Sequence, residues 1–106
     1  MLYEYRVYTC YPGKRDEFVK LMEEEIVPFQ VGKGMVFVAS FIDEQNPDKY
    51  IWMRRFENEE ERVKLYAAVY ESDTWKNDMV GRVLALIDRE KHQISRLVPT
   101  QKSILR

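Results

Sequence analysis

The sequence predicts an α+β domain of the ferredoxin-like type, with elements in the order β-α-β-β-α-β and a second helix broken in two. Three observations predict it: strand-type alternation at the start, helix-type spacing in two segments, and two apolar runs that flank a polar loop. Right-handed connections then place both helices on one face of a four-stranded antiparallel sheet. With 106 residues, 45% of them hydrophobic, residues 1–106 are expected to form a single domain.

The first strand is the stretch LYEYRVYTC at residues 2–10. Its neighbouring side chains point to opposite faces of a sheet, because the side-chain period of a strand is two residues. Pro12 and Gly13 end the strand as a turn, since proline fixes φ at one position and glycine accepts a positive φ at the next. One face of the strand carries Tyr3, Tyr5 and Val7, and the other carries Glu4, Arg6 and Tyr8.

The first helix is predicted over residues 15–29, where apolar residues recur at the helical period. Pro28 marks its fraying end, because proline disrupts a regular helix interior. Residues 35–42 and 50–56 then read as two strands joined by the polar loop DEQNPDK, which makes them a hairpin. The apolar stripe of the helix consists of Phe18, Leu21, Met22, Ile26 and Phe29.

The second helix is predicted to begin after Asn58, which has Glu61 three positions later, as a helix N-cap does. Asp73 is expected to cap a further helical segment, and residues 93–98 form a last short strand that ends at Pro99. One face of the first part carries Val63, Tyr66, Ala67 and Tyr70, and the second part carries Trp75, Met79, Val83 and Ile87.

Composition excludes several classes of function. Charged residues make up 33% of the chain, but the net charge is -1, so no basic surface for nucleic acid or membrane is expected. The single cysteine, Cys10, forms no internal disulfide or metal cluster and is expected to be a small core residue. The start of the chain lacks the pattern of a signal peptide, so a cytoplasmic protein is expected.

The predicted topology leaves the second face of the sheet without helices. A row of Tyr8, Trp52 and Phe56 on that face is too apolar for water and predicts an interface. The simplest cover is a second copy of the chain, packed face to face by two-fold symmetry. The sequence therefore predicts a homodimer.

Five segments in order resemble the NIPSNAP family. They are YEYRVYTCYPGK at the start, IVPFQ after the first helix, FENEEER before the second, Trp75 further on, and RLVPTQKSILR at the end. The resemblance implies a dimeric α/β barrel, in which two ferredoxin-like protomers pack sheet to sheet and enclose a cavity in each half. Related barrels include cofactor-free monooxygenases of the antibiotic-biosynthesis type, haem-degrading enzymes, chlorite dismutases and muconolactone-type isomerases.

The adjacent arginines Arg54 and Arg55 raise the question of which one enters the barrel. If Tyr3, Tyr5, Val7, Ile51 and Met53 lie on the helix side, Arg54 points into the barrel and Arg55 reaches solvent. A buried charge needs a partner, and Glu4 on the neighbouring strand is the nearest candidate, with a bound anion as the alternative. The barrel side then carries Glu4, Arg6, Tyr8, Tyr50, Trp52, Arg54 and Phe56.

These residues have two interpretations. One is a pocket with an aromatic wall (Tyr50, Trp52 and Phe56) and a cationic floor, suited to a small aromatic or carboxylate-bearing ligand. The other is a Glu-Arg network that only holds two protomers in register.

Two functions follow from the first interpretation. The protein binds a small apolar or aromatic molecule, or a protein partner, without an established reaction. Alternatively it is a cofactor-free monooxygenase or isomerase, with Glu4 as the base, Arg6 or Arg54 as the stabiliser of negative charge, and Tyr8 as a donor. No metal or cofactor is expected. The only histidine, His92, sits in a polar stretch and is expected to be a solvated loop residue, and the glutamate runs at 23–25 and 59–61 are expected to be solvated helix faces.

Overall fold

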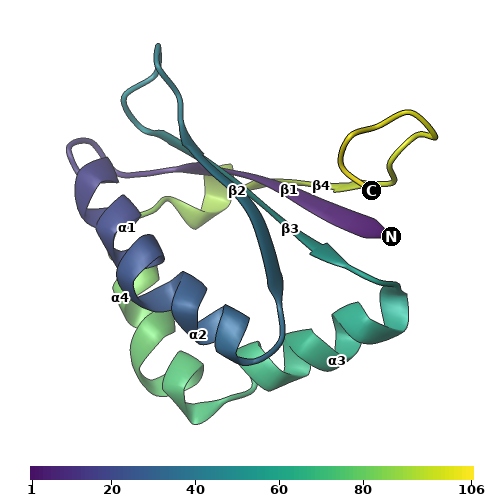
Figure 1. The fold of residues 1–106 in the computed structure, drawn as a ribbon. Helices are drawn as coiled ribbons and strands as arrows, with labels where there is room; N and C mark the ends of the chain where they lie inside the picture. The colour runs from purple at the N-terminus through teal and green to yellow at the C-terminus, as the bar shows by residue number, and fades with distance from the viewer.

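The structure, a computed structural model that describes residues 1–106, confirms the ferredoxin-like fold (Figure 1). None of its helices has the length and apolar character needed to cross a membrane. The strands are β1 (Leu2–Thr9), β2 (Val36–Ile42), β3 (Lys49–Phe56) and β4 (Gln93–Leu97). The helical segments are α1 (Arg15–Leu21), η1 (Met22–Ile26), α2 (Val27–Gly32), α3 (Glu59–Tyr70), η2 (Trp75–Met79), α4 (Val80–Leu84) and η3 (Arg89–Lys91).

The four strands form one sheet in the order β2-β3-β1-β4, and all neighbours are antiparallel. In the β1–β3 pair, Glu4 lies directly opposite Arg54, as the sequence predicted for neighbouring first and third strands. The helical segments all pack on one side of the sheet, and the C-terminal segment loops out beside the N-terminus (Figure 1). The other side of the sheet carries no helix, and it is called the open face below.

The assignment of residues to the two sheet faces was wrong. The side chains predicted to point away from the helices point towards them: Tyr8 and Trp52 are buried in a core cluster with residues of α1, η1 and α4. The strand alternation itself is correct, so Tyr5, Val7, Ile51 and Met53 lie on the open face instead. The error arises because both faces carry large apolar side chains and the face under the helices also carries charged ones, so the pattern of a strand alone gives no sign of which face the helices cover. The side chains on the helix side are Glu4, Arg6, Tyr8, Tyr50, Trp52, Arg54 and Phe56.

The first helix runs further than predicted, because a π-helical turn accommodates Pro28. The η1 turn precedes the proline, and the N–H of Val27 donates to the carbonyl of Met22 five residues earlier. Helical structure then continues through α2 to Gly32, with Pro28 in its first turn. Proline lacks an N–H and is tolerated in a first turn, so it does not end the helix here.

The second helix begins as predicted and differs in its details. The Asn58 side chain accepts a hydrogen bond from the N–H of Glu61 at 2.8 Å, so the predicted N-cap is confirmed. The later segment is capped by Ser72 rather than Asp73, since the Ser72 hydroxyl accepts from the N–H of Trp75 at 3.2 Å. On α3 the buried side chains are Leu65 and Val69, and they form a second core cluster with Met35 and Phe56.

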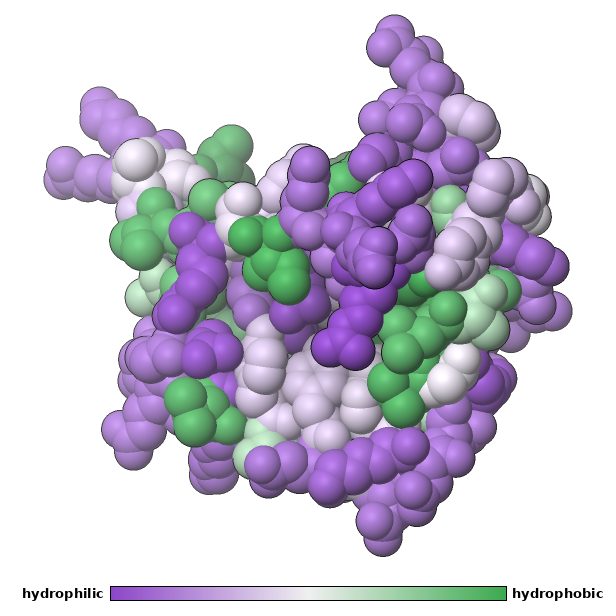
Figure 2. All heavy atoms as spheres, turned by 180° about the vertical axis from the view of Figure 1, so that it is seen from behind, coloured by the Kyte–Doolittle hydropathy of each residue, from purple (hydrophilic) through white to green (hydrophobic).

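The open face remains rich in apolar side chains. Tyr5, Phe41 and Leu97 are exposed there, with Phe41 58% exposed. At one end of this face the C-terminal segment packs beside Tyr3, which is only 3% exposed. The view from behind shows separate hydrophobic patches among hydrophilic atoms, with near-neutral atoms gathered below the middle (Figure 2).

Two valines of α3 test how this helix is oriented. Val69 is fully buried, whereas Val63, which the sequence placed on one apolar face with Tyr66 and Tyr70, is 55% exposed. We expect Val69→Ala to lower the free energy of unfolding by about 2 kcal/mol, because two buried methyl groups leave a cavity. The matched change Val63→Ala is expected to stay within about 0.5 kcal/mol. Urea unfolding of both variants measures this difference, and equal losses would contradict the orientation of α3.

Candidate functional site

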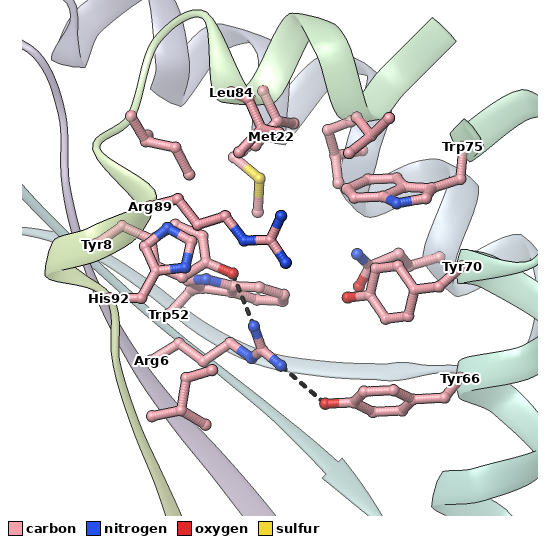
Figure 3. Close-up of a pocket in the computed structure, with 16 residues that line it drawn as sticks. Arg6, Tyr8, Met22, Trp52, Tyr66, Tyr70, Trp75, Leu84, Arg89 and His92 are labelled. Carbon is pink, nitrogen blue, oxygen red and sulfur yellow. Dashed lines mark hydrogen bonds between the residues drawn. The ribbon is translucent and has the colours of Figure 1, made fainter. Parts of the chain in front are cut away.

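A pocket of about 510 Å³ lies between the sheet and the helices of one chain (Figure 3). Its walls come from β1, β3, β4, α2, α3, α4, η1, η2 and η3, and most of the lining residues are apolar. Met22 and Leu84 lie on one side, and the labelled rings face one another across the space in Figure 3. The aromatic side chains that line it are Tyr8, Trp52, Tyr66, Tyr70, Trp75 and His92.

Behind this pocket, Arg54 is held by an almost complete set of partners. Its Nε donates to Oε1 of Glu4 at 2.6 Å, and its Nη1 donates to Oε1 of Gln30 at 2.9 Å. Its Nη2 donates to the hydroxyl of Tyr66 at 3.1 Å. Both Glu4 and Arg54 are buried, at 2% and 1% exposure. The predicted Glu4–Arg54 ion pair is therefore confirmed, and it forms between neighbouring strands of one chain.

Tyr66 connects this pair to Arg6. The Tyr66 hydroxyl donates to Oε2 of Glu4 and accepts hydrogen bonds from Arg54 and from Nη2 of Arg6, the latter at 2.8 Å. Arg6 also approaches Oε2 of Glu4 at 3.7 Å. Two guanidinium groups thus share one carboxylate, and the buried network carries one excess positive charge.

The protonation states in this network follow from its charges. Burial alone would raise the pKa of Glu4, but the charges of Arg54 and Arg6 and the hydrogen bond from Tyr66 outweigh it and lower that pKa. Burial raises the pKa of Tyr8 and of Tyr66, so both phenols stay protonated. Glu4 is accordingly ionised and fully engaged, which is a poor state for a base.

Several polar atoms in the pocket wall have no partner. They are Nε of Arg6, Nε1 of Trp52 and Nε2 of His92, all buried. The Tyr8 hydroxyl accepts from Nη1 of Arg6 at 2.9 Å, which leaves the proton of that hydroxyl free to be donated. Because buried polar groups are normally hydrogen-bonded, a cluster of unpaired ones in a pocket indicates a place for a ligand.

His92 and Arg89 are the site residues that the sequence interpretation missed. His92 is not a solvated loop residue: its ring is half-buried in the pocket wall and stacks on Tyr8, with ring centroids 4.1 Å apart and planes at 14°. Arg89 is exposed overall and turns its guanidinium into the cavity (Figure 3). The sequence signal that could have identified them is that Arg89 and His92 are three residues apart. In a 3-10 turn such as η3, residues with this spacing lie on the same face.

Each predicted site residue has a definite place. Arg6, Tyr8 and Trp52 line the pocket, whereas Glu4 and Arg54 lie behind it and support it. The predicted wall residues Tyr50 and Phe56 do not reach the pocket. Tyr50 packs in the core with its hydroxyl 2.7 Å from Ser40 Oγ, and Phe56 belongs to the second core cluster.

Two further expectations concern metals and the single thiol. Cys10 is buried and free, as predicted for a small core residue, and burial raises its pKa to about 11. No group of three His, Cys, Asp or Glu side chains is arranged to hold a metal ion. The run at 23–25 is exposed, and Glu25 forms a 2.5 Å ion pair with Arg82.

The two adjacent arginines differ in their surroundings, and a stability measurement tests this. Arg54→Ala leaves Glu4 buried without its main partner, so we expect a loss of about 3–5 kcal/mol in the free energy of unfolding. Arg55 is half-buried and bonds only the backbone oxygen of Arg106, at 3.3 Å. Arg55→Ala should therefore cost no more than about 0.5 kcal/mol. Denaturant unfolding compares the two variants, and a similar loss in both would refute the assignment.

Comparisons with known proteins agree with this architecture. A crystal structure of a NIPSNAP family protein from Agrobacterium tumefaciens is 26% identical in sequence, with a TM-score of 0.87, and the alignment covers 99% of this chain and 98% of that one. An uncharacterised NIPSNAP domain protein from Burkholderia xenovorans has a TM-score of 0.85 at 16% identity, with 97% and 98% of the two chains covered.

The fold is also similar to that of a more distant protein. An antibiotic biosynthesis monooxygenase has a TM-score of 0.68 at 15% identity, covering 94% of this chain and 99% of that chain, which is a likeness of fold alone. No curated protein matches the sequence. The model of the NIPSNAP family matches residues 3–102, nearly the whole chain, and we conclude that this protein belongs to the NIPSNAP family.

Proposed function

We propose that this NIPSNAP protein binds a small aromatic molecule with a negatively charged group in the pocket between its sheet and its helices. The observation that carries the proposal is the excess of positive charge in an aromatic cavity. Arg6 shares Glu4 with Arg54, and Arg89 has no acidic partner at all. An anion would balance these guanidiniums, and the rings would pack against a planar ligand.

The size of the pocket agrees with a small ligand. Its volume of about 510 Å³ falls within the usual range of small-molecule sites, roughly 300–1,000 Å³. A cation such as an ammonium compound would face Arg6 and Arg89, so like charges oppose it. A protein partner is the weaker candidate for this cavity, because a recess lined from both the sheet and the helices admits a single side chain rather than a surface.

The second candidate function is a cofactor-free monooxygenase or isomerase that acts on a small aromatic or carboxylate substrate. Glu4 is unsuited to be its base, since it does not line the pocket and accepts bonds from Arg54 and Tyr66. Arg54 likewise supports the site from behind. What favours this candidate is the unpaired imidazole nitrogen of His92, whose role is considered below.

We further propose that the protein is a homodimer formed through the open face. The side chains from which the sequence predicts a dimer, Tyr8, Trp52 and Phe56, lie under the helices and do not support this proposal. The open face itself does, because Tyr5, Phe41 and Leu97 are exposed on it. A second copy provides the same apolar surface by two-fold symmetry. This pairing leaves the pocket outside the interface, since the two lie on opposite faces of the sheet.

Ligand binding can be followed through tryptophan fluorescence. Both tryptophans of the chain, Trp52 and Trp75, line the pocket, so quenching reports on this site. We expect 4-nitrobenzoate to quench them and Arg89→Gln to weaken this binding at least about 10-fold, because a hydrogen bond to a charged group contributes about 1.5–3 kcal/mol. The neutral 4-nitrobenzamide should bind both forms alike.

The control for this experiment is Lys91→Gln. Lys91 belongs to the same turn, but its side chain is exposed and pairs with Asp88 at 3.9 Å, outside the pocket. This variant should bind 4-nitrobenzoate as the wild type does. If neither probe binds the wild-type protein, or if both variants lose affinity equally, the proposed function is wrong.

The dimer is tested by charges on the two faces of β2. Phe41 lies on the open face and the adjacent Ile42 on the other, with similar exposures of 58% and 54%. Light scattering should give about twice the 12.8 kDa mass of the chain for the wild type and for Ile42→Glu. Phe41→Glu should give a folded monomer, because a carboxylate buried in an apolar interface has no partner. A monomeric wild type would refute the dimer.

A further inference from the structure

This inference rests on the proposed binding of a small aromatic anion and adds what the pocket does to its ligand. We propose that His92 takes a proton from the bound molecule, so that the pocket accepts phenols and enols and holds them as their anions. His92 would then be the catalytic base of any reaction that starts from such an anion. The base expected from the sequence, Glu4, is replaced in this role by a residue that lines the cavity.

The position of His92 supports this role. Its Nε2 is buried, lines the pocket and has no hydrogen-bond partner. The stack on Tyr8 fixes the plane of the ring, with 4.1 Å between the centroids. In Figure 3 the ring lies beside Tyr8 at the same end of the cavity as Arg89 and Arg6. A ligand hydroxyl at this end of the pocket meets both a base and two cations.

The other polar groups at this end are donors. Arg6, Arg89 and the indole N–H of Trp52 have no lone pair to offer, and the Tyr8 hydroxyl already accepts from Arg6. A neutral imidazole, by contrast, keeps one nitrogen as an acceptor. A phenol or enol can therefore donate its proton to His92, while its oxygen accepts from the guanidiniums.

The charges around His92 keep it ready to accept a proton. The groups that face it are Arg6 and Tyr8 on β1 and Asp88 and Arg89 at the η3 turn. Burial, Arg6 and Arg89 together lower the pKa of His92, and Asp88 opposes them only in part, so the free ring is neutral at pH 7. When an anion binds, it offsets the two arginines, and the proton on His92 becomes favourable.

The step balances without any other reactant. The O–H bond of the ligand breaks and an N–H bond forms on His92. The electron pair of the broken bond stays on the ligand oxygen, which becomes a phenolate or enolate, and His92 becomes an imidazolium. Arg6 and Arg89 stabilise the new negative charge, as donors aimed at a developing oxyanion do.

The experiment uses 4-nitrophenol, which absorbs visible light when it ionises, and protein labelled with 15N-histidine. Because His92 is the only histidine, the nitrogen signals report on it alone. The measurement is made at a pH between the pKa of His92, determined in the same sample, and the pKa of free 4-nitrophenol. We expect the phenolate band and the imidazolium signals to appear together as the complex forms.

Two comparisons separate this inference from the proposed function. The already ionised 4-nitrobenzoate should also bind, but it has no proton to give, so any proton that His92 gains in that complex comes from solvent and a pH indicator registers proton uptake. Neutral 4-nitrophenol should transfer its own proton and give no net uptake. His92→Phe keeps a ring against Tyr8, so it should still bind 4-nitrobenzoate but lose the phenolate band of 4-nitrophenol. A phenolate band without protonated His92, a band that survives in His92→Phe, or no binding of 4-nitrophenol would overturn the inference. Loss of binding for 4-nitrobenzoate as well would show that the proposed function has failed.

Discussion

The carboxylate of Glu4 is the group on which the rest of this structure depends. It is buried between two strands and a helix, and it receives Arg54, Arg6 and the hydroxyl of Tyr66. Without it, two guanidiniums would lie together in an apolar interior with no counter-charge. Through it, β1, β3 and α3 are fixed to one another behind the pocket. The network therefore holds these elements together and also makes the pocket cationic.

The same network determines which groups are free for chemistry. Arg54 uses all of its nitrogens on protein partners, and Tyr66 is saturated as donor and acceptor. Arg6, in contrast, shares the carboxylate of Glu4 with Arg54, and it retains an unpaired Nε beside the pocket. The separation between supporting residues and residues that line the pocket follows from this distribution of hydrogen bonds.

Much of the fold was predictable from the sequence, whereas the site was predictable only in part. The alternation in residues 2–9 and the helical spacing of Phe18, Met22 and Ile26 led to the correct topology, and the pairing of Glu4 with Arg54 followed from strand order. The choice of sheet face failed, because both faces carry large apolar side chains and local periodicity carries no information on which one the helices cover. His92 was undervalued for a similar reason: its polar neighbours in sequence point to solvent, while the ring itself turns inward to Tyr8.

The π-helical turns η1 and η2 have a consequence for how this family can vary. Each turn lies beside the pocket, where Met22, Ile26 and Trp75 line it. A π turn holds an extra residue compared with an α turn, so it behaves as a single-residue insertion that the helix has absorbed. Removing one residue from Met22–Ile26 would rotate the rest of that helix by about 100°. Gln30 would then leave Arg54, to which it is bonded at 2.9 Å. The shape of the cavity thus depends on the number of residues in these turns as well as on its side chains. Relatives that differ by one residue at these turns would have different pockets even with identical wall residues.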